Sequence, residues 1–327
     1  MKHTRKTLLT LLLAVLFLLA AATPAFAAEA LPNGAILITD SDTIKANEFT
    51  IIAQGGLSGC APENTLAAIK LAGRCGCDGC EIDVQPTLDQ RWVCFSDVNL
   101  SGSTNGIGLV STMTYDQLSE YVITRGGNIA QYPNEKVPTL EEAVAVCQLY
   151  GMKVVLTIRN GTVDQIDSLI LTMKTLGVMK TATVVSANSE ILKKIRDNGG
   201  RAVYNATPVI TLLNVETAQK NGYVGLATST VLPGATLLAR VLDNDLELYP
   251  YDVDSMLLAE HMYNAGVKTV VSTCLVKHAP AAENVTANAL TWFTRLFNDI
   301  YNFFAKMFRQ MSMQMLFNGI KNSLGIG

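Results

Sequence analysis

This sequence has little histidine and no excess of basic residues. Its 327 residues include three histidines, at positions 3, 261 and 278. Histidine is the side chain best suited to moving protons near neutral pH, so few positions can supply such a catalyst. Lys and Arg number 25 against 28 Asp and Glu, a formal net charge of −3. Nucleic-acid binding depends on neutralising phosphates with Lys and Arg, so no nucleic-acid partner is expected.

The apolar stretch near the start is too short to span a bilayer. Residues 8–22 form a run of about 15 residues, whereas a spanning helix requires roughly 20. Basic residues precede the run and Ala25-Phe26-Ala27 follows it, which is the pattern of a secretory signal. We predict a signal peptide at residues 1–27, a lead segment at 28–48 and a secreted or extracytoplasmic location. A short membrane anchor is the alternative.

The cysteines are odd in number. There are seven, at positions 60, 75, 77, 80, 94, 147 and 274. In an exported chain this count favours one or more disulfides and at least one unpaired thiol. The run Cys75-Gly-Cys77-Asp-Gly-Cys80 also resembles a metal motif, but a closed zinc site needs four ligands, and Cys80 falls in a predicted strand. Small buried residues or a disulfide are the favoured interpretation.

Short β-branched runs alternate with longer helical stretches between residues 50 and 272. We expect strands at 50–53, 80–84, 92–95, 153–158, 182–186, 202–205, 224–227, 247–251 and 269–272, and helices at 65–74, 115–122, 140–150, 163–176, 190–198, 215–221, 232–243 and 255–265. One helix has Thr139 as a predicted N-cap, with Glu142 in its first turn. The pattern favours an α/β fold, a (β/α)8 TIM barrel over residues 49–278, with a doubly wound open sheet as the alternative. The active site of such a barrel lies at the carboxyl ends of its strands.

Several motifs together resemble the glycerophosphodiester phosphodiesterase family, a group of TIM barrels related to phosphatidylinositol phospholipase C. The residues that carry the resemblance are Ala53-Gln54-Gly55-Gly56, Pro62-Glu63-Asn64-Thr65, Glu81-Ile82-Asp83, Ser96-Asp97, Leu100 to Gly106, Pro138-Thr139-Leu140-Glu141-Glu142 and Tyr251-Asp252-Val253-Asp254. The family patterns are A-H-R-G, P-E-N-T, E-x-D, H-D, L-x-R-T-T-N-G, P-T-L-E-E and W-T-V-N. The resemblance implies hydrolysis of a phosphoric diester from lipid or a related polymer, with two histidines transferring protons and a divalent cation on the E-x-D carboxylates.

The chain departs from the family at the positions that carry this chemistry. Gln54 and Ser96 stand where the two histidines are expected, and neither side chain titrates. Gly55 and Gly102 replace arginines, and Thr157 stands where a third metal carboxylate is expected. Arg159 keeps the positive charge of a family lysine. Five such changes with the scaffold motifs intact indicate a barrel that has lost this hydrolysis.

Glu81 and Asp83 alternate on one strand, so both side chains point the same way, into the barrel. Two adjacent buried carboxylates repel each other, and a cation, a proton or Arg159 must hold them. We therefore keep Ca²⁺ or Mg²⁺ as a candidate cofactor on this pair, with waters completing its shell. Asp97 is a candidate base, and His278 a candidate substitute catalyst because it follows the last strand.

The charge of the expected site predicts its ligand. Glu81, Asp83, Asp97, Asp252 and Asp254 cluster near the strand ends, while two arginines and two histidines of the family are absent. The family implies a glycerophosphodiester-like ligand, but the acidic pocket favours a ligand that is neutral and polar, or cationic.

The last residues follow a different pattern. A linker at 279–289 leads to residues 290–327, in which positions 292–311 place an aromatic and apolar half opposite a mildly basic half. Such an amphipathic helix favours association with a membrane surface through residues 290–311. Self-association or docking on the barrel is the alternative.

Three functions are weighed from these patterns. The first is an exported, surface-associated binding or scaffold module with little or no hydrolase activity. The second is an active metal-dependent phosphodiesterase that uses Glu81, Asp83, Asp97 and His278. The third is a hydrolase of another class on the same barrel, because a fold does not fix a function.

Overall fold

The computed structural model describes residues 30–40 and 44–281. The predicted signal peptide, most of the linker and the amphipathic tail lie outside the described residues, so these interpretations stay predictions. Among the described residues, no helix has the length and hydrophobicity that crossing a membrane requires.

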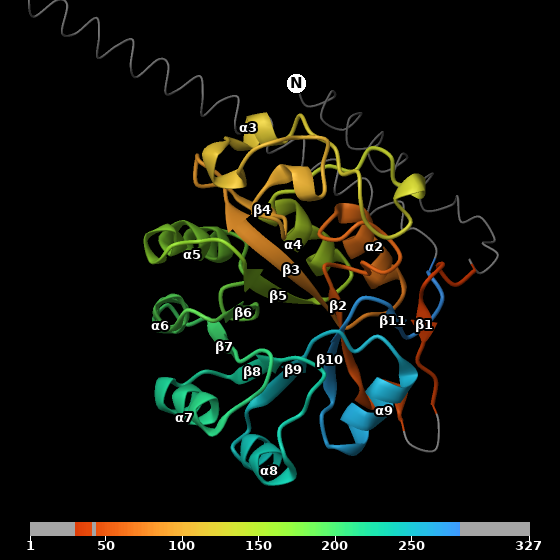
Figure 1. Cartoon of the computed structure of the whole chain (residues 1–327), viewed down its shortest axis with the longest axis vertical. Helices are drawn as coiled ribbons and strands as arrows, with labels where there is room; N and C mark the ends of the chain where they lie inside the picture. Colours follow the sequence, from red (N-terminus) through yellow and green to blue (C-terminus); the bar gives the residue numbers. More distant parts are fainter. Residues whose placement is uncertain (1–29, 41–43, 282–327) are drawn as a thin grey trace, which may run out of the picture. The chain divides into compact units, whose positions relative to one another are not determined.

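A ring of parallel strands forms the centre of the molecule (Figure 1). Its members are β2 (Thr50–Gln54), β3 (Gly79–Pro86), β5 (Lys153–Ile158), β6 (Thr183–Ser186), β7 (Arg201–Asn205), β8 (Gly225–Thr228), β9 (Glu247–Pro250) and β10 (Thr269–Ser272). They are hydrogen-bonded in the order β10-β2-β3-β5-β6-β7-β8-β9. At the remaining seam, between β9 and β10, the backbone N–H of Val253 donates to the carbonyl of Val271 at 3.2 Å. The nearly closed ring confirms the predicted TIM barrel.

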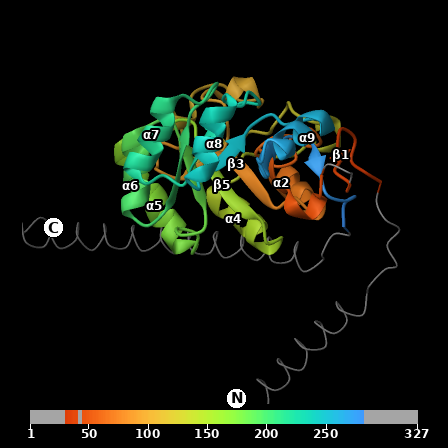
Figure 2. The ribbon, with the colours of Figure 1, turned by 90° about the horizontal axis from the view of Figure 1, so that it is seen from below.

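Helices cover the outside of this ring, and in the view of Figure 2 β3 and β5 lie among them. These helices are α2 (Leu66–Arg74), α4 (Leu140–Leu149), α5 (Ile166–Thr175), α6 (Ser189–Asp197), α7 (Leu212–Asn221), α8 (Ala235–Asp243) and α9 (Met256–Asn264). A short helix, α3 (Tyr115–Leu118), lies instead in the long connection before α4. The predicted cap of α4 is confirmed: the Thr139 hydroxyl accepts from the Glu142 N–H at 3.3 Å, and the Glu142 carboxylate accepts from the Thr139 N–H at 3.0 Å. This reciprocal pair fixes where α4 begins.

The barrel interior is apolar on most of its strands. Seven strands contribute one buried residue each to a single cluster of Ile52, Val155, Val185, Val203, Ala227, Tyr249 and Val271. The exception is β3, whose buried side chains include Glu81 and Asp83. Burying two carboxylates costs free energy unless they are paired or protonated, so this strand marks a functional centre.

Two predicted elements differ from the structure. The strand at 92–95 is not part of the ring: β4 (Trp92–Cys94) pairs antiparallel with β3 and leads into the long connection before α4. The helix expected at 115–122 ends at Leu118, because this connection packs on an apolar cluster of its own that includes Phe95, Leu118 and Ile123. The hydrophobic periodicity of a short segment does not distinguish an antiparallel strand outside the ring from a strand of the barrel.

The lead segment and the chain after β10 pair with each other. β1 (Ile36–Leu37) lies parallel to β11 (Leu275–Val276) in a two-stranded sheet.

All seven cysteines are buried free thiols, so the expected disulfides do not form in this structure. The thiols are small apolar side chains of the core instead, and burial raises the pKa of Cys60 to about 11.

Candidate functional site

The turn after β2 brings the first motif against α2. Gly55 and Gly56 have φ angles of +59° and +76°, in the left-handed region that favours glycine. A Cβ on Gly56 would lie 2.5 Å from the carbonyl carbon of Ala68, so the chain passes directly against the backbone of α2. Gln54, aligned with Glu81 on the neighbouring strand, thereby ends at the carboxyl face of the barrel.

The Pro62–Thr65 motif positions the second carboxylate of the site. The Asn64 amide donates to Asp83 Oδ2 at 3.1 Å, and its oxygen accepts from the Asp83 N–H at 2.9 Å. Asn64 also closes the preceding turn through its own N–H, which donates to Gly55 O at 2.8 Å. Thr65 caps α2 by accepting from the Ala68 N–H at 3.2 Å. This motif is a scaffold, and it is intact here.

Glu81 and Asp83 form the buried centre of the site, with 1% and 4% of their surface exposed. Asp83 Oδ1 accepts from Arg159 Nε at 2.5 Å. Glu81 Oε2 accepts from the Gly55 N–H at 3.2 Å, while its buried Oε1 has no partner in the described part of the chain. Burial, and then the charge of Asp83, raise the pKa of Glu81 to about 8. Of the three expected ways to hold this pair, the structure supplies Arg159 for Asp83, and the raised pKa of Glu81 favours a proton on that carboxyl.

Glu81 and Asp83 supply two of the three carboxylates expected for the divalent cation that family members typically use. Ca²⁺ takes six to eight oxygen ligands and Mg²⁺ six. Both carboxylate oxygens of Asp83 already have protein partners, whereas Glu81 Oε1 has none among the described residues. The Thr157 hydroxyl, at the place of the third carboxylate, bonds the Tyr251 hydroxyl at 3.1 Å. Among the described residues, no three His, Cys, Asp or Glu side chains are grouped as metal ligands.

The two expected histidine positions carry side chains that are hydrogen-bonded to acids. The Gln54 amide donates to Asp252 Oδ1 at 3.1 Å, and its oxygen accepts from the Asp252 N–H at 3.4 Å. The Ser96 hydroxyl donates to a carboxylate oxygen of Glu63. The structure thus brings Gln54, Ser96 and their acidic partners to the same end of the barrel, without a titratable base at either histidine position.

Asp97 occupies the space where a family arginine would begin. Its Oδ2 accepts from the Ser103 hydroxyl at 2.6 Å, and a Cβ on Gly102 would lie 2.2 Å from the same oxygen. Gln85, on the carboxyl end of β3, holds the segment by donating to the backbone carbonyl of Asp97 at 2.7 Å. Asp97 is therefore close to the site, but it is already engaged as an acceptor.

His278 does not belong to the site, contrary to expectation. β11 carries the chain away from the carboxyl face, and the His278 N–H donates to Cys75 O at 3.3 Å, in the loop before β3. Its ring lies against Gly76, at the amino-terminal end of the barrel.

Asp254 lies at the carboxyl face, where its side chain is already hydrogen-bonded. Its Oδ1 accepts from the Ser272 hydroxyl and the Thr273 N–H, both at 2.8 Å.

The motifs did not single out Tyr251, Glu63 or Arg125 as functional side chains. Burial, and then Glu81, raise the pKa of the Tyr251 phenol well above its usual value, so its hydroxyl stays protonated beside Thr157. Glu63 and Arg125 line a hollow of about 210 Å³, together with Ser58, Ser103 and Thr273. Arg125 comes from the long connection, whose path over the barrel cannot be read from spacing.

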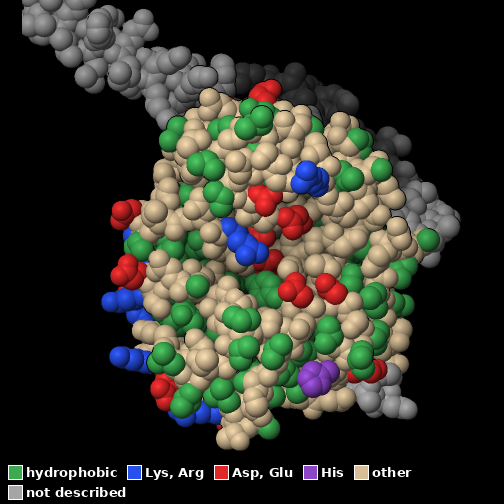
Figure 3. All heavy atoms as spheres, viewed as in Figure 1, with side chains coloured by type: hydrophobic (Ala, Val, Ile, Leu, Met, Phe, Trp, Pro, Cys, Tyr) green, Lys and Arg blue, Asp and Glu red, His purple; other side chains and the backbone are tan. Residues whose placement is uncertain are grey.

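The charge of this face is mainly negative. Figure 3 shows acidic side chains gathered around the hollow centre of the surface, with basic side chains beside them. Arg159, the basic residue within the buried centre, is paired with Asp83. The arrangement offers carboxylates, hydroxyls, amides and the guanidinium of Arg125 to a ligand.

Comparisons with known proteins agree with this architecture. The model of the "Glycerophosphoryl diester phosphodiesterase family" matches residues 56–272. Glycerophosphodiester phosphodiesterase 1 of Bos taurus is 31% identical over 159 residues, which are 48% of this chain and 48% of that protein. The chain thus spans about half the length of this relative. A glycerophosphodiester phosphodiesterase of Caldanaerobacter subterraneus is 28% identical over 236 residues, 68% of this chain and 93% of that protein.

Solved structures show the same fold. A phosphodiesterase of Oleispira antarctica, in complex with the product sn-glycerol-3-phosphate, has a TM-score of 0.63 at 27% identity, covering 68% of this chain and 92% of that one. A putative glycerophosphoryl diester phosphodiesterase of Agrobacterium tumefaciens has a TM-score of 0.59 at 17% identity, covering 76% and 99%. With the family model matched across the barrel, the chain belongs to the glycerophosphoryl diester phosphodiesterase family.

Proposed function

We propose that this protein is an exported, catalytically impaired member of its family that binds a small molecule at the carboxyl face of the barrel. The ligand is neutral and polar, or cationic, and binding requires no divalent cation. The predicted signal peptide supports export, and the predicted amphipathic helix at 290–311 supports a place at a membrane surface, as a binding or scaffold module.

The carrying observation is the state of the two histidine positions. Gln54 and Ser96 neither accept nor release a proton near neutral pH, and each is hydrogen-bonded to a carboxylate. Phosphodiester hydrolysis needs a base for the attacking hydroxyl and an acid for the leaving oxygen. His278, the substitute considered from sequence, lies at the opposite end of the barrel.

The charges of the site support the proposed ligand class. Gly55 and Gly102 stand at two arginine positions of the family, and the cation of Arg159 is neutralised by Asp83. The product in the Oleispira structure is a glycerol phosphate, so a ligand of glycerol size is expected here. Polyol hydroxyls can donate to the carboxylates of Glu63 and Asp252, whereas a phosphate would meet them with like charge.

Hydrolysis assays test the loss of catalysis. The purified protein and a variant with Gln54→His, Ser96→His and Thr157→Glu are incubated with glycerophosphocholine at millimolar Ca²⁺ or Mg²⁺. We add Gly55→Arg in a separate variant, because the φ angle of +59° strains any residue with a side chain there. An inert natural protein beside an active variant is expected. Turnover by the natural protein that is lost with a chelator and with Asp83→Ala would establish the alternative, an active metal-dependent phosphodiesterase.

Calorimetric titrations test the ligand class separately. Glycerol, choline and sn-glycerol 3-phosphate are compared as probes, each with and without a chelator. Binding of glycerol or choline in the presence of chelator supports the proposal. Tighter binding of sn-glycerol 3-phosphate without any divalent cation contradicts the assignment of ligand charge.

A further inference from the structure

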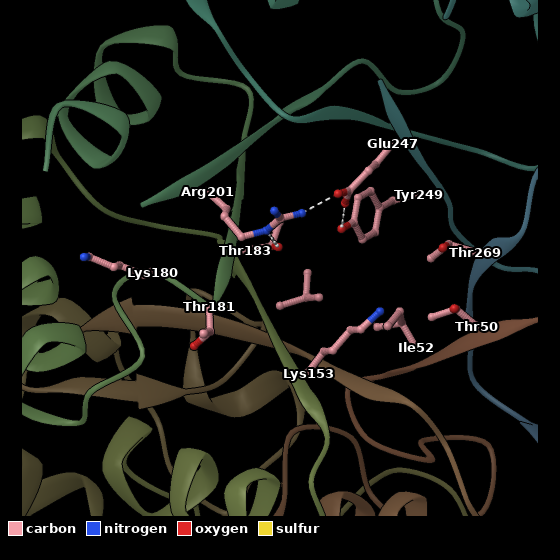
Figure 4. A pocket seen from close by; sticks show the side chains of 11 residues that line it. Thr50, Ile52, Lys153, Lys180, Thr181, Thr183, Arg201, Glu247, Tyr249 and Thr269 are labelled. Atoms are coloured by element: carbon pink, nitrogen blue, oxygen red, sulfur yellow. Dashed lines mark hydrogen bonds and ion pairs between the residues drawn. The ribbon is translucent and has the colours of Figure 1, made fainter. Parts of the chain in front are cut away.

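A second cavity lies at the amino-terminal end of the barrel, away from the candidate site (Figure 4). It has a volume of about 590 Å³, and its lining includes the first residues of six strands: Thr50, Lys153, Thr183, Arg201, Glu247 and Thr269. The candidate site uses the last residues of the strands. The two hollows are therefore separated by the apolar layer inside the ring, and each can hold a different ligand.

The floor of the cavity is apolar. Ile52 and Val155 are 1% and 2% exposed, and both belong to the cluster inside the barrel. The Tyr249 ring, 6% exposed, completes this floor. The apolar body of a ligand placed here leaves water and packs on this floor, which favours binding. The volume lies within the roughly 300–1,000 Å³ of small-molecule pockets.

Arg201, Tyr249 and Glu247 on the wall of the cavity are hydrogen-bonded to one another. Arg201 donates to Glu247, and the Tyr249 hydroxyl donates to the same carboxylate at 2.5 Å. Arg201 Nε also donates to the Thr183 hydroxyl at 3.3 Å. The Glu247 carboxylate thus accepts hydrogen bonds from both Arg201 and the Tyr249 hydroxyl. These three side chains need no ligand to satisfy them.

Lys153 is different. Its side chain points into the cavity (Figure 4), and no ion pair or hydrogen bond joins its ammonium to another described residue. Lys180 also lines the cavity, at its edge. The charge of Glu247 cancels that of Arg201, so the two lysines leave the wall with a net positive charge above an apolar floor. Such a surplus is complementary to an anionic group.

We propose that this amino-terminal cavity binds a small organic anion, with an apolar body on Ile52 and Val155 and its carboxylate, sulfonate or phosphate at Lys153. Arg201 borders the same space, and the hydroxyls of Thr50 and Thr269 supply further donors. The proposal is independent of the ligand at the carboxyl face, because the two sites share no residue.

Fluorescence titration with 8-anilinonaphthalene-1-sulfonate tests the proposal on the purified full chain. This probe combines an aromatic body with one sulfonate. Lys153→Met keeps the length of the side chain and removes its charge, without stranding an acidic partner. Lys153→Glu reverses the charge. Lys220→Met, at an exposed lysine in the last turn of α7, is the matched control.

The probe is expected to bind the natural protein, and Lys153→Met to raise its Kd by about 2–5-fold, the effect of one partly screened ion pair. Lys153→Glu should raise it further, whereas Lys220→Met and Gln54→His leave it unchanged. Far-UV circular dichroism checks that each variant is folded. No binding by the natural protein, or equal effects of Lys153→Met and Lys220→Met, overturns the proposal, whatever the carboxyl face binds.

Discussion

The protonation of Glu81 makes the stability of this barrel depend on pH in an unusual direction. The pKa of Glu81 is about 8 in the folded protein, against an ordinary value of 4.5. Between these values the folded chain holds a proton that the unfolded chain releases. Stability is therefore fully present at the acidic end and falls as the pH rises through this window. An acid stabilised by pairing shows the opposite trend.

The magnitude follows from the size of the shift. Each pH unit within the window removes roughly 1 kcal/mol of unfolding free energy from a fully buried group. Glu81 is 1% exposed, so solvent screening reduces this little. From about pH 5 to pH 8 the loss attributable to Glu81 is on the order of 3–4 kcal/mol, large beside the 5–15 kcal/mol of a typical domain.

Urea unfolding followed by circular dichroism at several pH values measures this loss. Glu81→Gln keeps the shape of the side chain and removes its titration, so the difference between the two proteins isolates Glu81 from every other titrating group. The unfolding free energy of Glu81→Gln, relative to that of the natural protein, should increase steadily as the pH rises. Glu120→Gln, at an exposed acid, is the control and should follow the natural protein. Parallel curves for Glu81→Gln and the natural protein would refute the reasoning.

Two further substitutions test the scaffold of the site, both by urea unfolding at neutral pH. Arg159→Met leaves Asp83 buried without its cation and should cost about 1–3 kcal/mol, reduced from the value of a fully buried pair because Arg159 is 44% exposed. Lys194→Met breaks an exposed pair and should cost less than about 1 kcal/mol; equal losses would contradict the role of Arg159. Gly56→Ala should cost about 3 kcal/mol or more, because the new methyl meets the backbone of α2 at a left-handed φ. Gly177→Ala has a similar φ of +72° with open space around it, so a loss of only about 1 kcal/mol is expected there, and a matching loss at Gly56 would count against the packing argument.

The elements of the barrel could be predicted because their signals are local. Alternating β-branched runs and amphipathic stretches gave the strands and helices of the ring within a few residues, and Thr139 with Glu142 gave a cap that the structure confirms. The pairing of Trp92–Cys94 was not predictable in this way. An antiparallel ribbon and a barrel strand have the same period, and only the partner strand distinguishes them.

The site was predictable where one strand or one short motif places the residues. Glu81 and Asp83 share a face because they alternate on β3, and Arg159 directly follows the neighbouring strand β5. His278 was misplaced because the return of the chain through β11 depends on its pairing with Ile36–Leu37, far away in sequence. The hydrogen bond between Ser96 and Glu63 likewise joins two loops that no spacing relates.

The residues that match the family pattern have a structural role that differs from that of the residues which depart from it. Asn64 fixes the turn before α2 and bonds the backbone of Asp83, and Thr65 caps α2. Gly56 allows the chain to pass directly against the backbone of α2. Replacing any of them would leave backbone groups unpaired or strained. The positions at which this chain departs from the family pattern include Gln54 and Ser96, and both carry hydrogen-bonded polar side chains. Gln54 even adds a structural bond, since its amide joins the end of β2 to Asp252, beside the seam where β9 meets β10. Because this one amide group bonds both the side chain and the backbone of Asp252, Gln54 ties the end of β2 to the loop that follows β9.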